Sequence, residues 1–347
     1  MNFKNNTFVP LSYFLLMFSC FKKIVITIIV SCSVSVAFCQ SATYAAIDEY
    51  AANLPSTPLP ILADKLTQPY ADTTEKVRAI FRWVTAHIEY DKAAFHDDSI
   101  YKNFWKPNNK KSQAWNDSLY NAKIVSYVFT NKKAICDGYS RVFRYLCEQA
   151  GIRAMKIDGF LRTASNPIGQ EITGANHSWN AVYINHQWNL LDPTRAAGYT
   201  DARVTKYTFD FKDFYFFTSP SLLAFSHYPT DTKWLLTAEP FSKKDFSNQP
   251  IIYRAFAQEK IQYYTPKNGL LKSTMDTLFF TLTLPISSPS SSFVIVPQGM
   301  TTIPANYPIQ YTQTGNNVQL WYVPTSTNPA TIIVLMNNNA LLQYKIQ

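Results

Sequence analysis

Cysteine is scarce in this chain, which contains five cysteines among 347 residues. Three of them precede residue 40, so removal of an N-terminal leader would leave only Cys136 and Cys147. These two lie on one predicted helix, roughly 16 Å apart at about 1.5 Å per residue, and no disulfide can span that distance. The mature chain therefore lacks a disulfide framework, and a thiol retained in an exported protein points towards chemistry.

Long apolar runs are also rare. The sequence contains one, from Ile24 to Val36, which follows two lysines and precedes a small-residue pattern ending at Cys39. This order predicts a secretory signal peptide over residues 1–39, and a start at Met17 would give that peptide its usual length. Lipidation of Cys39 is the rival interpretation, although Phe38 is bulky for the residue before a lipidated cysteine. We expect an exported protein, whether periplasmic, cell-surface or secreted, with no second membrane span.

Charge clusters and paired metal ligands are missing as well. The chain has 32 basic and 23 acidic residues, and removal of the three lysines before residue 40 leaves 29 basic residues and a net charge of +6. This modest excess suits an anionic cell-envelope component nearby, whereas no basic run with interleaved aromatics suggests nucleic acid. No two cysteines or histidines have the spacing of metal ligands, so we expect neither a metal nor a cofactor.

The segment KAICDGYSRVFRYLCEQAG, residues 133–151, predicts a buried helix that starts at a cysteine. Its apolar residues recur at three- and four-residue spacing, and Gly151 stands where a C′ residue would end the helix. Cys136 would lie beside unpaired backbone N–H groups and the positive end of the helix dipole, which favour a thiolate. The alternative is an inert core cysteine, which is our interpretation of Cys147.

Upstream of this helix the pattern is less regular. Asp72-Thr73-Thr74-Glu75 is a capping-box signature ahead of one apolar helical face, which predicts a helix that ends near Ile88. The proline-containing residues 40–71 are interpreted as an N-terminal adapter segment. The polar region from Lys102 to Asn121 has no clear period, so we expect loops with short helical pieces.

Two predicted strands, His177–Ile184 and Gln187–Asp192, flank a two-residue turn at Asn185-His186. This turn would place Asp192 opposite Trp179 and diagonal to His177, on one face of the hairpin. Diagonal neighbours lie about 7–8 Å apart, within reach of a hydrogen bond between a carboxylate and an imidazole. A three-residue turn would instead put the two side chains on opposite faces.

A cysteine nucleophile needs a base, and the base needs a group that orients it. Among five histidines, His177 is the best candidate because Asp192 is available to it. The others are less well placed: at the end of a helix, in a polar loop, at a hairpin tip and in an aromatic segment (His87, His96, His186 and His227). Asp192 is also open to a second interpretation, a turn-initiating Asp-Pro pair.

The remainder of the chain divides into two parts. Residues 207–250 are rich in aromatic residues and are expected to form an extension packed over the first domain. Residues 251–347 contain short apolar or alternating runs separated by turn residues, which predict a small all-β domain with the architecture of a sandwich. The predicted domains are thus a signal peptide, an adapter, a catalytic domain with its extension, and a C-terminal β domain (1–39, 40–71, 72–250 and 251–347).

The segments KKAICDGYSRVFRYLCEQAGIRAMKIDGF and NHSWNAVYINHQWNLLDPTRAAGY resemble the core of the transglutaminase-like superfamily, the papain-related group that includes kyphoscoliosis peptidase-like proteins. The cysteine, histidine and aspartate occur in that family's order. AIFRWVTAHIEYD is similar to its leading helix, and FYFFTSP, HYP and KWLL are similar to the extension of secreted bacterial members. The resemblance covers about residues 72–250, and no motif extends it into the β domain.

The resemblance implies an α+β, papain-like transglutaminase fold, with the helix that bears Cys136 packed on an antiparallel sheet. It also implies that Cys136 attacks a carbonyl group, His177 carries the proton and Asp192 orients His177. A thioacyl intermediate released to water would make the protein a peptidase or amidase, and release to an amine would make it a protein-crosslinking transglutaminase. A third possibility is a non-catalytic binding or envelope-scaffold protein that retains the fold.

Three further residues are candidates for contacts to the substrate or its oxyanion. Lys123 lies near the position where many relatives have a glutamine that donates to the oxyanion, and Ala134 replaces a common glycine. Trp179 and Tyr139 are aromatic residues that could cradle a substrate, although packing in the core is the simpler interpretation. No acidic cluster suggests the calcium dependence of animal transglutaminases.

Overall fold

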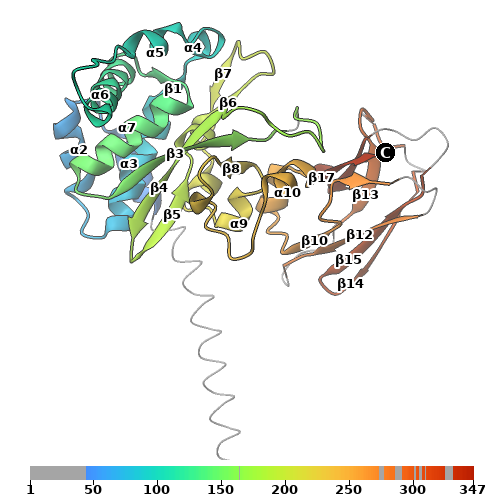
Figure 1. Cartoon of the computed structure of the whole chain (residues 1–347). Coiled ribbons are helices and arrows are strands. Elements are labelled where there is room, and N and C mark those ends of the chain that lie inside the picture. Colours follow the sequence, from blue (N-terminus) through green and yellow to red (C-terminus); the bar gives the residue numbers. More distant parts are fainter. Residues whose placement is uncertain are drawn as a thin grey trace, which may run out of the picture.

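The computed structural model describes residues 44–347, except residues 164, 273–276, 286–290, 301, 305–306, 309 and 325–330. The predicted signal peptide, including Met17 and Cys39, lies outside these residues. Of the helices described, none combines the length and apolar character needed to cross a membrane. The elements fall into two halves, a mixed helix-and-sheet half followed by a half made mostly of strands (Figure 1).

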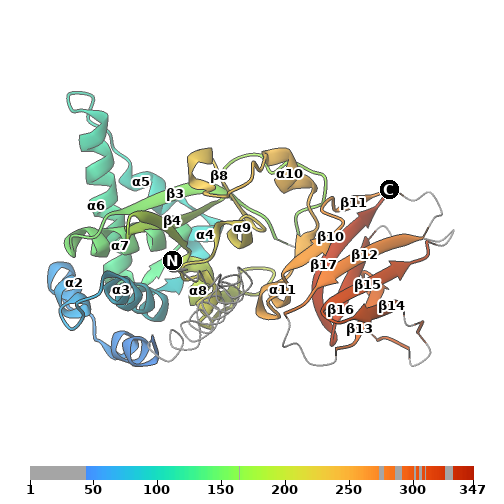
Figure 2. The ribbon, with the colours of Figure 1, turned by 90° about the horizontal axis from the view of Figure 1, so that it is seen from below.

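The helix α7, Cys136–Gln149, is central to the first half. Its apolar face is fully buried, and Gly151 follows it with a φ of 70°, as the sequence predicts for a C′ glycine. The helix packs against two strands, β3 and β4, and against three helices, α2, α3 and α6 (Figure 2). These partners span Ala154–Leu161, His177–Ile184, Leu59–Thr67, Thr73–His87 and Gln113–Asn131, respectively.

The sheet beneath α7 has the strand order β5-β4-β3-β8, and all its neighbours are antiparallel. Its outer strands are β5, Gln187–Leu191, and β8, His227–Pro229. The helix on an antiparallel sheet is the arrangement that the sequence predicts, and the α+β fold class is confirmed. The strand β8 comes from the aromatic extension, so this extension completes the sheet as well as packing on it.

The helix α3 begins at the predicted cap, because the Asp72 carboxylate accepts hydrogen bonds from the backbone N–H groups of Thr74 and Glu75. The polar region differs from the prediction. The helix α6 spans 19 residues and starts at Gln113, where Ser112 caps it through the Trp115 N–H. Several of its early residues face solvent, so they carry little apolar periodicity. Three shorter elements precede it, β1 (Glu89–Tyr90), α4 (Lys92–His96) and α5 (Ser99–Phe104).

Residues from the predicted adapter are part of the first half's core. Residues 44–53 are helical, and their buried side chains Ile47 and Ala51 join Leu62 of α2 in the same apolar cluster as α7. Arg78 of α3 ties this segment down, because its guanidinium binds both carboxylate oxygens of Asp48 at 2.6 Å. The adapter segment and the predicted catalytic domain therefore share one core.

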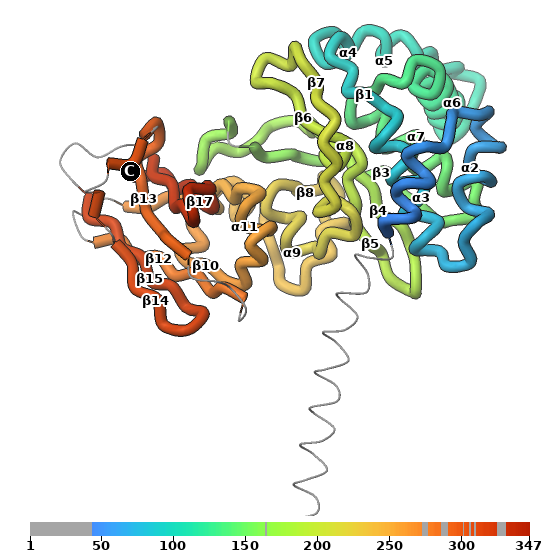
Figure 3. Tube along the Cα trace, turned by 180° about the vertical axis from the view of Figure 1, so that it is seen from behind, coloured from blue at the N-terminus to red at the C-terminus, as the bar shows by residue number. Residues whose placement is uncertain are grey.

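The segment between β5 and residue 250 is made of short elements. It begins with α8, Pro193–Ala197, and a two-stranded ribbon, β6 and β7, which lie beside the main sheet (Figure 3). The remaining elements lead to β8 and then to the second half. The two strands of the ribbon are β6, Gly198–Thr200, and β7, Tyr207–Phe209. Before β8 come a 3-10 turn, Asp213–Tyr215, and α9, Pro220–Leu223; after it come a second 3-10 turn, Thr232–Trp234, and α10, Lys243–Asn248.

The second half is a sandwich of two sheets, with strand orders β10-β12-β15-β14 and β11-β17-β16-β13. Its separate core includes Phe280 and Tyr344, whose ring centroids lie 5.0 Å apart. The strands expected for this β domain are present, together with one short helix, α11. In chain order, from β9 and α11 to β17, the elements span Ile251–Ile252, Arg254–Gln258, Tyr263–Thr265, Leu270–Leu271, Leu278–Thr283, Phe293–Pro297, Tyr311–Thr314, Asn317–Tyr322, Thr331–Met336 and Asn339–Ile346.

Candidate active site

Cys136 is the first residue of α7 and is partly exposed. The short strand β2, Lys133–Ala134, pairs in parallel with β1 and leads the chain into the helix. No side chain caps α7, so its first N–H groups stay available to a ligand or transition state at the thiol. Cys147 is fully buried in the core, and burial raises its thiol pKa far above the ordinary value. Of the two thiols, only Cys136 is placed for chemistry.

The hairpin of β4 and β5 has the predicted register. Ile184 pairs with Gln187 across the turn, and Asn180 pairs with Leu191, as a two-residue turn requires. Both turn residues have positive φ, 52° and 63°, typical of the hairpin turn expected here. The register places Asp192 and His177 on one face, and the His177 Nε2 lies 2.7 Å from Asp192 Oδ2.

The pKa of His177 is raised to about 10. Its complete burial opposes the charge, but the Asp192 carboxylate and a hydrogen bond to Cys136 outweigh that penalty. Burial likewise opposes the charge of Asp192, yet its contacts with His177 and His227 lower the pKa of this carboxyl far below its usual range. His177 therefore lies between the Asp192 carboxylate and the Cys136 side chain, and its raised pKa favours the charged imidazolium form.

Comparison with known proteins agrees with this geometry. Residues 61–193 match the model of the transglutaminase-like superfamily. The chain contains a transglutaminase-like domain. The resemblance drawn from the sequence segments around Cys136, His177 and Asp192 is thereby confirmed, although the match begins and ends earlier than the predicted residues 72–250.

The transglutaminase-like domain also relates the chain to curated proteins. Kyphoscoliosis peptidase of Homo sapiens is 29% identical over 214 residues, which cover 61% of this chain and 29% of that protein. Hillarin of Drosophila melanogaster is 24% identical over 219 residues, 58% of this chain and 24% of that protein. The chain thus spans less than a third of either relative. A crystal structure of a TGase is 19% identical, covers 44% of this chain and 32% of that chain, and has a TM-score of 0.26, too low to add to the assignment.

Two contacts lock α7 onto the sheet in the transglutaminase-like domain. The Asn180 amide of β4 is fully buried and donates to the backbone carbonyls of Ser140 in α7 and Met155 in β3. Asp137, next to Cys136, forms ion pairs with Arg141 and with Lys156 of β3. These contacts fix the start of the helix relative to the strand that bears His177.

Asp192 has the two functions that the sequence left as alternatives. Its Oδ1 accepts a hydrogen bond from the Arg195 backbone N–H at 2.9 Å and so caps α8. Its Oδ2 faces the imidazole of His177. The Asp-Pro pair therefore starts a helix, and that helix start fixes the carboxylate for the histidine.

The three remaining candidates have different surroundings. Trp179 is buried, and its indole stacks on the His177 ring at 6.2 Å with an interplanar angle of 23°. Tyr139 is fully buried, and its hydroxyl donates to the Ile88 carbonyl, so it packs in the core. Lys123 is half-buried on α6, and none of the contacts described for this part of the chain joins it to Cys136, His177 or Asp192. Its role as an oxyanion donor stays a prediction.

His227 is the functional residue that the sequence ranked low. Its Nε2 lies 3.0 Å from the same Asp192 Oδ2 that binds His177, and only 2% of the residue is exposed. Thirty-five residues separate it from Asp192 in sequence, and β8 reaches the site only through its pairing with β3. The HYP tripeptide was the available signal, but sequence alone does not place it beside the hairpin.

His177, Asp192 and His227 are also types of residue that bind metals, and one ligand atom of each lies within 4.8 Å of the others. This proximity was not predicted from sequence spacing. Both imidazoles direct Nε2 at one carboxylate oxygen over hydrogen-bond lengths of 2.7 and 3.0 Å. An ion would lie about 2.0–2.2 Å from each ligand atom and would have to separate these groups. The arrangement fits shared hydrogen bonds better than a metal centre.

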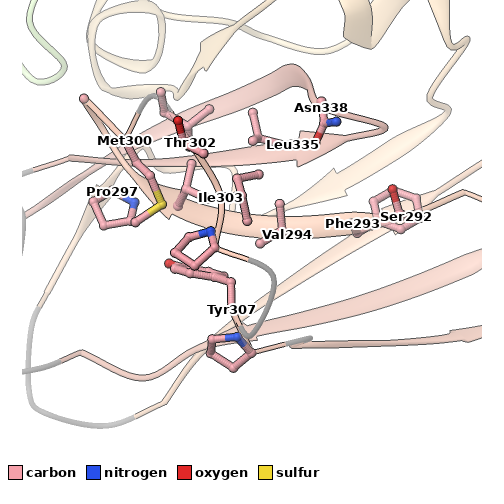
Figure 4. A pocket seen from close by; sticks show the side chains of 15 residues that line it. Ser292, Phe293, Val294, Pro297, Met300, Thr302, Ile303, Tyr307, Leu335 and Asn338 are labelled. Atoms are coloured by element: carbon pink, nitrogen blue, oxygen red, sulfur yellow. The ribbon is translucent and has the colours of Figure 1, made fainter.

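Cavities occur near this cluster and in the sandwich. One cavity of about 540 Å³ is lined in part by Arg195, Tyr215 and Ser226. The Arg195 backbone N–H binds Asp192, and the Ser226 hydroxyl binds His227. Another of about 720 Å³ belongs to the sandwich, where Val294 and Tyr307 are among its lining residues (Figure 4). Neither lining includes Cys136, His177 or Asp192, so the candidate active site is assigned from side-chain contacts and not from a cavity.

Proposed function

We propose that the protein is an exported cysteine acyl-transfer enzyme that hydrolyses peptide or amide bonds through a thioacyl intermediate. The observation that carries the proposal is the placement of His177, which is hydrogen-bonded to Asp192 at 2.7 Å and to Cys136, with Cys136 partly exposed at a helix start. The name of the human relative, a peptidase, agrees with this reaction class. Export rests on the leader pattern of residues 1–39, and a protein or peptide of the cell envelope is the substrate that we expect.

The mechanism follows from the placement of the two side chains. The Cys136 thiolate attacks the carbonyl carbon of the amide and forms a C–S bond, and the carbonyl oxygen takes the negative charge. His177 then gives its proton to the departing amine as the C–N bond breaks. In the second half of the reaction, the neutral His177 takes a proton from water as the water oxygen attacks the thioacyl carbon; the C–S bond then breaks, which releases the acid and restores the Cys136 thiolate beside the protonated His177. Asp192 keeps the imidazole oriented and stabilises its charge throughout.

Besides Lys123, two groups are candidates for stabilising the oxyanion. The backbone N–H of Cys136 is one, because it belongs to the uncapped first turn of α7. The Tyr90 hydroxyl is the other. Tyr90 pairs with Ala134 just before Cys136, and the charges of Cys136 and Arg195 both act on it. Burial, the largest cause, raises the pKa of Tyr90 well above its ordinary value, so it keeps the proton that it would donate.

The first experiment is the pH dependence of Cys136 alkylation by iodoacetamide, in full-length mature protein with Cys147→Ala as the common background. We expect rapid alkylation well below the pH at which an ordinary thiol ionises, about 8.5, and a shift to higher pH in His177→Ala. Cys136→Ala is the blank. A thiol that reacts like a free cysteine and is indifferent to His177 would refute the proposal and leave a non-catalytic binding protein.

Substrate chemistry is decided by a second assay. A casein digest is incubated with the enzyme in the presence and absence of a dansylated amine, and new N-termini and incorporated dansyl groups are counted. We expect new N-termini in both conditions. Incorporation of the amine without cleavage would identify a transglutaminase instead. Tyr90→Phe should lower kcat roughly 10- to 100-fold if its hydroxyl donates to the oxyanion, and an unchanged kcat would leave the Cys136 backbone N–H and Lys123 as candidates.

A further inference from the structure

Asp192 binds two imidazoles, and the acyl-transfer mechanism uses only one of them. His177 and His227 approach the same oxygen, Oδ2, at 2.7 and 3.0 Å, and their ring centroids lie 5.4 Å apart. The Arg195 backbone N–H occupies Oδ1. This carboxylate therefore accepts three hydrogen bonds while 0% of Asp192 is exposed. A buried carboxylate is held in its charged form when its oxygens are satisfied in this way.

The hydrogen bonds of His227 define its tautomer. An ionised carboxylate only accepts hydrogen bonds, so the proton between His227 and Asp192 belongs to His227 Nε2. The other ring nitrogen, Nδ1, lies 2.8 Å from the Ser226 hydroxyl. In the neutral imidazole this nitrogen is an acceptor, so the Ser226 hydroxyl donates to it. Burial, the largest cause, lowers the pKa of His227, which agrees with a neutral ring.

The fold holds His227 in this position from several sides. Its strand, β8, pairs with β3, where His227 faces Leu161. Between β4 and β8 stands Gly159, and a Cβ there would lie 2.5 Å from the Trp179 ring and 2.3 Å from the Tyr228 carbonyl. Because this glycine leaves space, the Trp179 indole reaches across β3 and meets the His227 ring edge-on at 5.1 Å. Trp179 thus packs against both imidazoles of the cluster.

We propose that His227 is a positioning residue that, as a neutral imidazole, donates its Nε2 proton to Asp192 Oδ2 and fixes the carboxylate against His177. This inference rests on the proposed function of Cys136 and His177. The second donor shares the negative charge of Oδ2, so it moderates how strongly Asp192 holds the proton on His177. Ser226 completes the chain, because its hydroxyl keeps the Nδ1 of His227 as the acceptor.

The electrostatic surroundings of His227 give the direction of the effect. The charged groups that act on it are Asp192, His177 and Arg195, and the Tyr215 ring lies 6.3 Å away. Without the His227 donor, Oδ2 has more negative charge to offer His177, so His177 becomes a weaker acid. The leaving amine is then protonated more slowly, and the alkaline limb of the pH profile moves to higher pH. His227 is buried, so substrate binding is unaffected.

The test compares two variants of the mature full-length protein. His227→Gln keeps an N–H donor at a similar distance from the backbone, whereas His227→Leu removes it. We expect kcat to fall roughly 10- to 100-fold in His227→Leu, as for other partners that orient a functional imidazole. KM should change little, the alkaline limb should rise, and His227→Gln should recover most of kcat. Equal losses in the two variants, or no loss in His227→Leu, would overturn the inference.

A spectroscopic measurement separates this inference from the proposed function. In protein labelled with ¹⁵N-histidine, His227 should be neutral with its proton on Nε2 between pH 7 and 9, because burial lowers its pKa from the ordinary value of 6.5. The pKa of His177 should rise in His227→Leu and remain near the wild-type value in His227→Gln. A His227 that becomes charged in this range, or a His177 pKa indifferent to both variants, would overturn it. Absence of turnover in wild type would refute the function but leave these resonances decisive.

Ser226→Ala is the variant to use if His227→Leu does not fold. It leaves both imidazoles in place and removes only the hydrogen bond to Nδ1, which allows the proton of His227 to move away from Asp192. We expect a several-fold lower kcat with an unchanged melting temperature. The inference fails if Ser226→Ala has the wild-type kcat and the wild-type tautomer of His227.

Discussion

The two halves of the molecule differ in what they bury. Among the described residues, the first half buries six that can carry charge, Arg78, Asp91, Arg162, His177, Asp192 and His227. The buried polar residues of the second half are Ser291 and Gln343, neither of which is ionisable. Burying a charge costs free energy unless it is paired. The half that bears this cost is the half with a chemical site, which is where perturbed groups are expected to gather.

The sandwich shows the burial pattern of strands that need not enclose charged side chains. Several of its strands alternate buried and more exposed residues, as in β16, where every second residue is buried. The main sheet lacks this alternation at β4, where nearly all residues are buried because α7 covers one face and other elements cover the other. A strand buried on both faces can hold His177 and Asn180 away from water. The sandwich strands are suited to packing or to a binding surface.

Neutralising Asp192 would break this contrast most severely. In Asp192→Asn the two imidazoles lose their anionic partner, so we expect kcat to fall roughly 10³- to 10⁴-fold, as in other triads that lose the carboxylate charge. Steady-state kinetics and the pH dependence of Cys136 alkylation would measure the loss. Asp64→Asn, at an exposed carboxylate of α2, is the matched control and should keep wild-type kcat. A kcat within tenfold of wild type in Asp192→Asn would contradict the proposed role.

Truncating the sandwich core would separate stability from chemistry. Phe280→Ala removes a fully buried ring, and we expect its half to lose about 3–5 kcal/mol of unfolding free energy. The rate of Cys136 alkylation in the folded protein should stay unchanged. The adjacent Phe279→Ala, at a residue that is 56% exposed, should leave both quantities near wild type. A change in alkylation rate that parallels the loss of stability would mean that the halves are energetically coupled.

The pH dependence of the unfolding free energy should report the ionised pair buried in the first half. The pKa of His177 rises from 6.5 to about 10 on folding, so its contribution to stability is complete below pH 6.5 and is lost as the pH rises through about 10. Asp192 has a lowered pKa, so its contribution is present above its ordinary pKa and is lost as the pH falls. Thermal unfolding between pH 6 and 10 should therefore show a steeper loss in wild type than in His177→Gln. Equal slopes would contradict the raised pKa.

Removal of metal should have the smallest effect. If the His177, Asp192 and His227 cluster shares hydrogen bonds instead of an ion, dialysis against EDTA should leave the melting temperature and the alkylation rate of Cys136 unchanged. A loss of either that added zinc restores would identify a metal centre in the cluster.

Lys156→Met removes an ion pair with Asp137 without altering the cluster. This change should lower the free energy of unfolding by roughly 1 kcal/mol.

Much of the site was predictable because its determinants are local. The Asn185-His186 turn fixed the register of the hairpin, and this register put His177 and Asp192 on one face. The apolar spacing and the terminal glycine likewise fixed α7. The start of α6 at Gln113 was not predictable from periodicity, because the early residues of that helix lie largely at the surface.

What the sequence by itself determined is the placement of Cys136 at a helix start and of His177 beside Asp192, the proposed nucleophile, base and orienting carboxylate, since turn chemistry and helical spacing act over a few residues. Tertiary structure alone decided that the helix at residues 44–53 joins the core and that His227 reaches Asp192. Both depend on packing between segments far apart in the chain. Such contacts are selected by the burial and pairing of the whole fold, and no local spacing encodes them.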